Sequence, residues 1–214
     1  MTTTSTLNET NLREAADWLA LHDHRMARVL EHCGYPPLWA REPGYATLVH
    51  IILEQQVSLA SANATFHKLK ETLEGNITPA TLLGLSDDTL KQAGFSRQKT
   101  RYTRLLSEAV IAGDFSFEVL PEMTDEEVRT EMTRLKGIGH WTADIYLSEC
   151  LLRPDILPKG DIAMQEAFRV LTDLPKRPEH EAFVEATRHW QPWRSVGTRM
   201  LWHYYLSHMK KRVS

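Results

Sequence analysis

The chain of 214 residues is 42% hydrophobic and 25% charged, a composition that is ordinary for a globular protein. Its net charge of −3 argues against nucleic-acid binding through bulk positive charge, although helix ends can still bind single phosphates. The chain has no apolar run long enough to cross a membrane and no N-terminal signal sequence, so we expect neither membrane attachment nor secretion.

Apolar side chains recur at helical spacing along nearly the whole chain, and no segment shows the alternation that is typical of strands. The first helix is predicted over about residues 9–32, and Gly34 ends it. A second helix begins after Gly44 and breaks around residues 55–58, after which another continues to Gly75. The pattern therefore predicts an all-α protein.

Capping residues and glycines delimit the remaining helices. Thr124, with Glu127 three residues later, matches a capping box that starts a helix. The further helices are expected to open at Pro79 and to run from Ser86 to Gly94, Ser96 to Ala112, Thr124 to Leu135, Trp141 to Leu152, Asp161 to Thr172, Pro178 to His189 and Ser195 to Lys210.

The most informative segment is residues 135–144, with the sequence LKGIGHWTAD. One helix ends here, Gly137 and Gly139 form a tight turn around Ile138, and a second helix begins at once. The amides at the start of the second helix are expected to point outward and to favour an anion, and Lys136 can add a charged contact. The alternative is a plain corner in which the glycines only permit the bend.

One carboxylate stands out after this hairpin. Asp161 follows Gly160, opens an apolar-patterned helix and lies about 22 residues beyond Gly139. Taken alone, an aspartate in this place is a helix N-cap. Asp155 and Asp144 are rival carboxylates, and Asp144 falls inside the second hairpin helix, where we expect a structural role.

The string Gly-Ile-Gly-His-Trp-Thr-Ala at residues 137–143 resembles the helix-hairpin-helix motif of the HhH-GPD superfamily of DNA glycosylases, and in particular its 3-methyladenine DNA glycosylase II branch. The resemblance covers about residues 35–208. It implies two packed helical lobes with the active site in the cleft between them, without the extra N-terminal β domain of larger bacterial enzymes. The expected lobes are residues 1–44 with 159–214, and residues 45–158 with the helix-hairpin-helix at about 124–152.

The resemblance also implies roles for single residues. Asp161 would be the catalytic carboxylate, Trp202 the wall of the base pocket that faces it, and Trp141 a second wall. Gln56, with Gln55 next to it, occupies the position of the wedge that fills the hole left by a flipped nucleotide. The residues expected to bind the DNA backbone are Lys136, Gly137, Gly139, His140 and Thr142. A monovalent cation, Na⁺ or K⁺, would be held by the backbone carbonyls of Thr133, Leu135 and Ile138.

These roles predict a monofunctional glycosylase that excises alkylated purines of the 3-methyladenine and 7-methylguanine type in base excision repair. Its partner would be double-stranded DNA with an alkylated base, its state a monomer, and its location the bacterial nucleoid or the nucleus. The chemistry needs no cofactor, because an alkylated purine is already cationic and one carboxylate can stabilise the sugar cation that forms as it leaves.

Two other functions compete with this interpretation. A bifunctional glycosylase/AP lyase needs a lysine nucleophile, and in lyase members of the superfamily that lysine stands where Trp141 is here, although Lys136 and Lys159 lie near in sequence. A non-catalytic DNA-binding protein would keep the hairpin without turnover, and the presence of Asp161 and Trp202 speaks against it.

The sequence offers little for a metal site. His22, His24 and His32 are not spaced to share one helix face. Two cysteines, Cys33 and Cys150, are too few for a zinc ribbon or a four-thiolate iron–sulfur cluster. A cationic stretch can face phosphates or simply form a solvated helix face, and it consists of Arg97, Lys99, Arg101 and Arg104.

Overall fold

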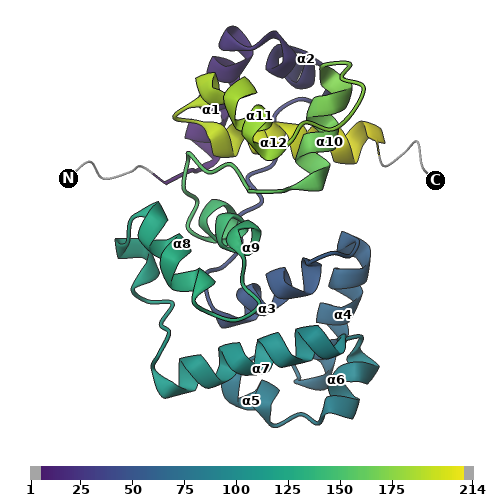
Figure 1. Cartoon of the computed structure of the whole chain (residues 1–214), viewed down its shortest axis with the longest axis vertical. Coiled ribbons are helices and arrows are strands. Elements are labelled where there is room, and N and C mark those ends of the chain that lie inside the picture. The colour runs from purple at the N-terminus through teal and green to yellow at the C-terminus, as the bar shows by residue number, and fades with distance from the viewer. Residues whose placement is uncertain (1–5, 210–214) are drawn as a thin grey trace. The chain divides into compact units, whose positions relative to one another are not determined.

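The computed structural model describes residues 6–209, which form helices and turns without a β-strand. The prediction of an all-α protein is confirmed. None of the helices in this part of the chain combines the length and the apolar character needed to cross a bilayer. The α-helices labelled in Figure 1 are α1 (Glu9–His22), α2 (His24–Cys33), α3 (Tyr45–Glu54), α4 (Leu59–Thr72), α5 (Pro79–Leu83), α6 (Asp87–Ala93), α7 (Arg97–Ala112), α8 (Asp125–Thr133), α9 (His140–Ile145), α10 (Ile162–Leu171), α11 (His180–Ala186) and α12 (Arg194–Tyr204).

The prediction of one continuous helix over residues 9–32 is wrong, because Asp23 divides it into α1 and α2. The backbone of Asp23 is extended, and its carboxylate caps α2 by accepting a hydrogen bond from the amide of Arg25 at 2.9 Å. The same carboxylate accepts bonds from the indole of Trp190 at 2.8 Å and from Nε2 of His189 at 2.9 Å. Burial alone would raise the pKa of Asp23, but the bonds from Arg25, Trp190 and His189 outweigh burial and hold that pKa well below its usual range.

Most other helix starts follow the predicted caps. Ser86 and Ser96 each accept a hydrogen bond from the amide three residues ahead. Ser58, which was predicted only as part of a helix break, caps α4 in the same way. Thr124 and Glu127 form the predicted capping box. The helix predicted over residues 141–152 is instead the short α9, which continues as a π-helical turn over Tyr146–Cys150.

The last helix also ends in a π-helical turn. α12 continues over Tyr205–Met209, and the predicted end of this helix at Lys210 lies outside the described residues. A 3₁₀ turn, Arg188–Trp190, follows α11 and occupies the end of the helix predicted over residues 178–189.

The chain divides into two compact units. The terminal unit contains the described residues 6–40 and 147–209, and the central unit contains residues 41–146. In the terminal unit, α1, α2, α10 and α12 pack around a common core (Figure 1). In the central unit, the apolar helix α3 is almost wholly buried and contacts α4, α7 and α9.

These boundaries differ from the predicted junctions at residues 44/45 and 158/159. Residues 147–158 belong to the terminal unit because Leu152 accepts a backbone bond from Leu7 at 2.8 Å, and the hydroxyl of Ser195 both donates to the carbonyl of Arg153 and accepts from the amide of Ile156. These are tertiary bonds, which the local sequence pattern does not reveal.

A substitution at Gly197 tests how tightly the terminal core is packed. A Cβ at this position of α12 would lie 2.4 Å from a carbon of the Trp190 ring, which is fully buried. Because that ring has no room to move, we expect Gly197→Ala to lower the free energy of unfolding by about 2 kcal/mol, or the Tm by about 6 °C. Calorimetry measures the shift.

Gly84→Ala is the matched control, since a Cβ there meets only carbonyl oxygens at 3.5 and 3.6 Å, which is ordinary contact. Its Tm should stay within about 1 °C of the wild type. Equal Tm values for Gly197→Ala and the wild type would contradict the packing described for α12.

Candidate active site and nucleic-acid interface

The hairpin predicted from the sequence joins α8 to α9 in the central unit. Gly137 has φ +97°, a left-handed conformation that favours glycine, and a Cβ there would lie 2.1 Å from the ring of Tyr102. Ile138 is buried, as a residue that fills the joint between two helices should be. Gly139 is the N-cap of α9. Because glycine has no side chain, it accepts no hydrogen bond from the first amides of that helix.

An ion pair holds the two hairpin helices together. Asp144 on α9 is buried, and its carboxylate accepts a hydrogen bond from Nε of Arg129 on α8 at 2.7 Å. Burial opposes the charge on Arg129, but its bond and attraction to Asp144 raise its pKa. This pair accounts structurally for Asp144, one of the rival carboxylates.

Gln55 braces the turn of the hairpin from the end of α3. Its amide nitrogen Nε2 donates hydrogen bonds to the carbonyl of Gly137 and to the hydroxyl of Thr142, both at 2.9 Å. Thr142 is buried and uses its hydroxyl for this contact. The amide of Gln55 is therefore engaged with the hairpin, whereas Gln56 is exposed and has a left-handed backbone with φ +58°.

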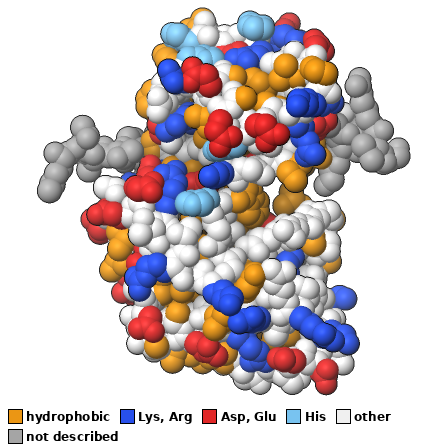
Figure 2. Space-filling model, in the orientation of Figure 1, with side chains coloured by type: hydrophobic (Ala, Val, Ile, Leu, Met, Phe, Trp, Pro, Cys, Tyr) orange, Lys and Arg blue, Asp and Glu red, His pale blue; other side chains and the backbone are white. Residues whose placement is uncertain are grey.

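Some of the basic side chains near the hairpin and on α7 are exposed, and others are bonded within the central unit. Lys136 and His140 are exposed beside the turn. In the cationic stretch on α7, Lys99 donates to the carbonyl of Leu53, and Arg104 pairs with Asp87 at 2.8 Å. Arg97 and Arg101 are exposed. On the face seen in Figure 2, Lys and Arg are interspersed with Asp and Glu, which agrees with the net charge of −3.

In the terminal unit, Asp161 is the N-cap of α10 and 7% exposed. Its Oδ1 accepts a hydrogen bond from the backbone amide of Met164 at 2.8 Å and a second from the indole Nε1 of Trp202 at 3.2 Å. Asp161 is therefore a helix N-cap, as its position in the sequence predicts. The same carboxylate oxygen also bonds to Trp202, the residue that the resemblance places opposite Asp161. Two donors from two helices fix the orientation of this carboxylate.

The remaining rival carboxylate has a different environment. Asp155 accepts from Nε and Nη2 of Arg194 at 2.7 and 2.8 Å in a bidentate ion pair, which ties the loop before α10 to the start of α12. Trp190 is fully buried in the core. Trp141, on α9, is partly buried in the central unit.

Sequence analysis missed one aromatic residue. Trp39 lies with its ring centroid 6.3 Å from that of Trp202, at an interplanar angle of 66°. Its backbone is left-handed, with φ +48°. No local pattern marks this tryptophan, because it lies between two helices and far in sequence from Trp202.

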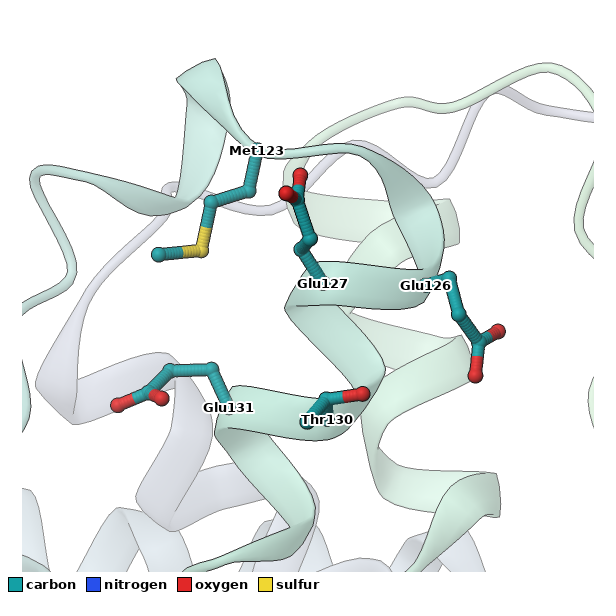
Figure 3. Close-up of a pocket in the computed structure, with 5 residues that line it drawn as sticks. All are labelled: Met123, Glu126, Glu127, Thr130 and Glu131. Atoms are coloured by element: carbon teal, nitrogen blue, oxygen red, sulfur yellow. The ribbon is translucent and has the colours of Figure 1, made fainter.

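Two cavities lie in the central unit. The first, of about 340 Å³, is lined by Met123 and by Glu126, Glu127, Thr130 and Glu131 of α8 (Figure 3). Its three carboxylates make it unsuitable for a phosphate. The second, of about 220 Å³, lies beside Gln55 and Gln56 and is lined in part by Lys99.

No part of the described structure gathers three or more His, Cys, Asp or Glu side chains into a candidate metal site. The Nδ1 atoms of His22 and His32 each contact a backbone carbonyl of their own helix, 2.7 Å away in both cases.

A family model for HhH-GPD superfamily base excision DNA repair proteins matches residues 49–192. The chain belongs to this superfamily. The match contains the hairpin, Gln55, Gln56 and Asp161, and it stops before Trp202.

Relatives within the superfamily carry names that specify alkylation repair. The chain is 28% identical over 179 residues to a putative DNA-3-methyladenine glycosylase, YfjP, of Bacillus subtilis. The aligned residues cover 80% of this chain and 62% of that protein. It is 28% identical over 200 residues to DNA-3-methyladenine glycosylase 1 of Schizosaccharomyces pombe, covering 90% of this chain and 87% of that protein.

A solved structure of the Schizosaccharomyces pombe 3-methyladenine DNA glycosylase Mag1, in complex with abasic DNA, is similar to this chain. The TM-score is 0.83 at 28% identity, over 88% of this chain and 95% of that one. The chain thus spans nearly the whole length of this relative and under two thirds of the Bacillus subtilis protein.

The hydrogen bonds from Gln55 to the hairpin lead to a prediction about stability. Gln55→Met keeps the length of the side chain and removes the donor that serves Gly137 and Thr142. Because these two acceptors, of which Thr142 is buried and Gly137 partly buried, then lose their partner, we expect the free energy of unfolding to fall by about 2 kcal/mol in urea titrations.

Gln98→Met is the control. Gln98 is an exposed residue of the same unit, and its Nε2 donates to the hydroxyl of Tyr102 at 2.7 Å. We expect a change of about 0.5 kcal/mol or less for this variant. If the two variants lose the same stability, Gln55 has no special part in holding the hairpin.

Proposed function

We propose that this protein is a monofunctional DNA glycosylase that excises alkylated purines from double-stranded DNA in base excision repair. The observation that carries the proposal is the Asp161 carboxylate, held at the start of α10 by the Met164 amide and the Trp202 indole. It occurs in a chain of the HhH-GPD superfamily whose relatives are named as 3-methyladenine glycosylases. A DNA substrate places the activity in the nucleoid of a bacterium or the nucleus of a eukaryote.

The hairpin is proposed to bind the DNA backbone through its amides. The first turn of α9 offers backbone N–H groups without a side-chain cap, and the positive end of the helix dipole favours a phosphate there. Lys136 and His140 are exposed beside the turn and can add contacts. Gly137 is proposed to contribute its amide, and Gly139, where a Cβ would meet nothing within 4 Å, lets the DNA backbone come close. The hydroxyl of Thr142 already accepts a bond from Gln55, so Thr142 contributes its amide.

In the proposed reaction, the bond between C1′ of the sugar and the base nitrogen breaks, and its electron pair leaves with the base. Positive charge develops on the sugar, and the fixed anion of Asp161 stabilises it. Water then adds to C1′, and Asp161 accepts the proton that this water loses. The only co-reactant is water, so no cofactor takes part.

The damaged base has to leave the stack before this step. Trp202 is proposed to form one wall of the pocket that receives it and Trp141 another, because aromatic faces attract a cationic base. Gln56 is proposed as the wedge. It is exposed at the end of α3, whereas the amide of its neighbour Gln55 is engaged with the hairpin.

A monovalent cation, Na⁺ or K⁺, is proposed at the carbonyl oxygens of Thr133, Leu135 and Ile138. Thr133 ends α8, and Leu135 and Ile138 lie in the turn after it. The carbonyl of Leu135 accepts a hydrogen bond from the amide of Ile138 at 3.1 Å, but a carbonyl oxygen has a second lone pair, and oxygen is the donor that such cations take. Bound there, the cation would supply positive charge beside a phosphate.

The alternatives lack comparable support. A lyase would need a lysine nucleophile. Lys136 and Lys159 are both exposed, and Trp141 stands at the position that the lysine occupies in lyases of the superfamily. In a non-catalytic DNA-binding protein, Asp161 would need only the bond from Met164 to cap α10, and the second bond, from the Trp202 indole, would have no role.

Asp161→Asn tests the proposal. The substitution keeps the size of the side chain and a capping oxygen but removes the charge, so folding should be retained. We expect single-turnover release of bases from methylated duplex DNA to fall by about 100-fold or more. Chromatography of the released bases provides the measurement.

Asp173→Asn is the matched control, an exposed aspartate of the same unit in a left-handed conformation that asparagine adopts readily. It should release bases at the wild-type rate. Equal release by wild type and Asp161→Asn would refute the catalytic role, and efficient covalent trapping with borohydride would identify a lyase.

A further inference from the structure

Trp39 is held in a strained conformation by a buried arginine. Its φ of +48° lies in the left-handed region, which a tryptophan rarely adopts unless its surroundings impose it. The residue before it, Leu38, accepts a hydrogen bond at 2.8 Å from Nε of Arg199, whose side chain is fully buried. Arg199 is itself fixed by bonds to Ser148 and to the carbonyl of Ser195. This part of the terminal unit therefore fixes the backbone that carries Trp39.

The strained backbone brings the Trp39 indole against Trp202. The two ring centroids are 6.3 Å apart, and the planes are inclined by 66°, so the rings meet edge to face and form an aromatic corner instead of a parallel stack. Both side chains are partly exposed. Since the indole N–H of Trp202 is bonded to Asp161, the corner lies next to the proposed catalytic carboxylate.

The His203 ring, which contacts Trp39, is electrically neutral at physiological pH. His203 meets the Trp39 ring edge-on, with centroids 6.3 Å apart and an interplanar angle of 89°. Burial, with a smaller contribution from His208, lowers the pKa of His203, so its ring carries no charge. His203 therefore adds no positive charge next to the Trp39 ring that would repel a positively charged base.

We propose that Trp39 is a specificity-determining residue that forms, with Trp202, an aromatic corner selecting cationic alkylated purines over neutral undamaged ones. The inference rests on the proposed function and adds a residue to it. A cation placed over an indole face is attracted by the ring, while a neutral purine gains only the stacking contact. A second indole beside Trp202 therefore favours the methylated base.

The test compares Trp39→Leu and Trp39→Phe with the wild type. Single-turnover release of 7-methylguanine should fall about 10-fold in Trp39→Leu and recover most of its rate in Trp39→Phe. Affinity for a duplex with a tetrahydrofuran abasic site, which has no base to select, should stay within about two-fold. Trp18→Leu is the matched control because Trp18 is a partly buried tryptophan of the same unit that stacks on His22.

A second measurement needs no turnover. Fluorescence anisotropy gives the preference for methylated over unmodified duplex, which should be reduced in Trp39→Leu and unchanged in Trp18→Leu. The proposal fails if Trp39→Leu keeps both its release rate and this preference, or if its affinity for the abasic duplex falls as much as its release rate. A wild-type protein that prefers methylated duplex but releases no base would refute the glycosylase function and leave the binding test of Trp39 intact.

Discussion

The carboxylate of Asp161 accepts hydrogen bonds from the Met164 amide and the Trp202 indole, so that one oxygen atom joins the start of α10 to α12. An aspartate that only capped its helix would need the first bond alone. The second fixes both partners, because the indole can donate only with its edge turned toward the carboxylate. The proposed function of the terminal unit depends on this contact, since it places a fixed anion at the edge of an aromatic ring.

A chain with a net charge of −3 would have to bind DNA differently from a basic protein. Its proposed phosphate contact consists of backbone amides at the start of α9, whose partial charges are positioned by the fold and do not change the net charge. The turn that presents these amides is held by Gln55 and by the ring of Tyr102 against Gly137. In this proposal, backbone amides held in place at the turn attract the phosphate, which a basic protein would attract through its net positive charge.

The local features of the fold were predictable because they depend on neighbours in sequence. The capping box of Thr124, the helix breaks at glycines and the hairpin around Gly137 all follow from short-range chemistry. The break at Asp23 was missed because a buried carboxylate looks like any charged residue of an amphipathic helix until Trp190 and His189 meet it. Trp39 was missed for the same reason, since its partner Trp202 is distant in sequence.

Asp161 is proposed to present a fixed negative charge to a sugar cation. Affinity for two duplexes that differ only at the abasic position measures this directly, one with a cationic pyrrolidine in place of the sugar and one with neutral tetrahydrofuran. We expect the wild type to bind the pyrrolidine duplex roughly 100-fold more tightly, because it mimics the transition state. In Asp161→Asn the difference should disappear. Equal affinities of the wild type for the two duplexes would show that Asp161 does not have this role.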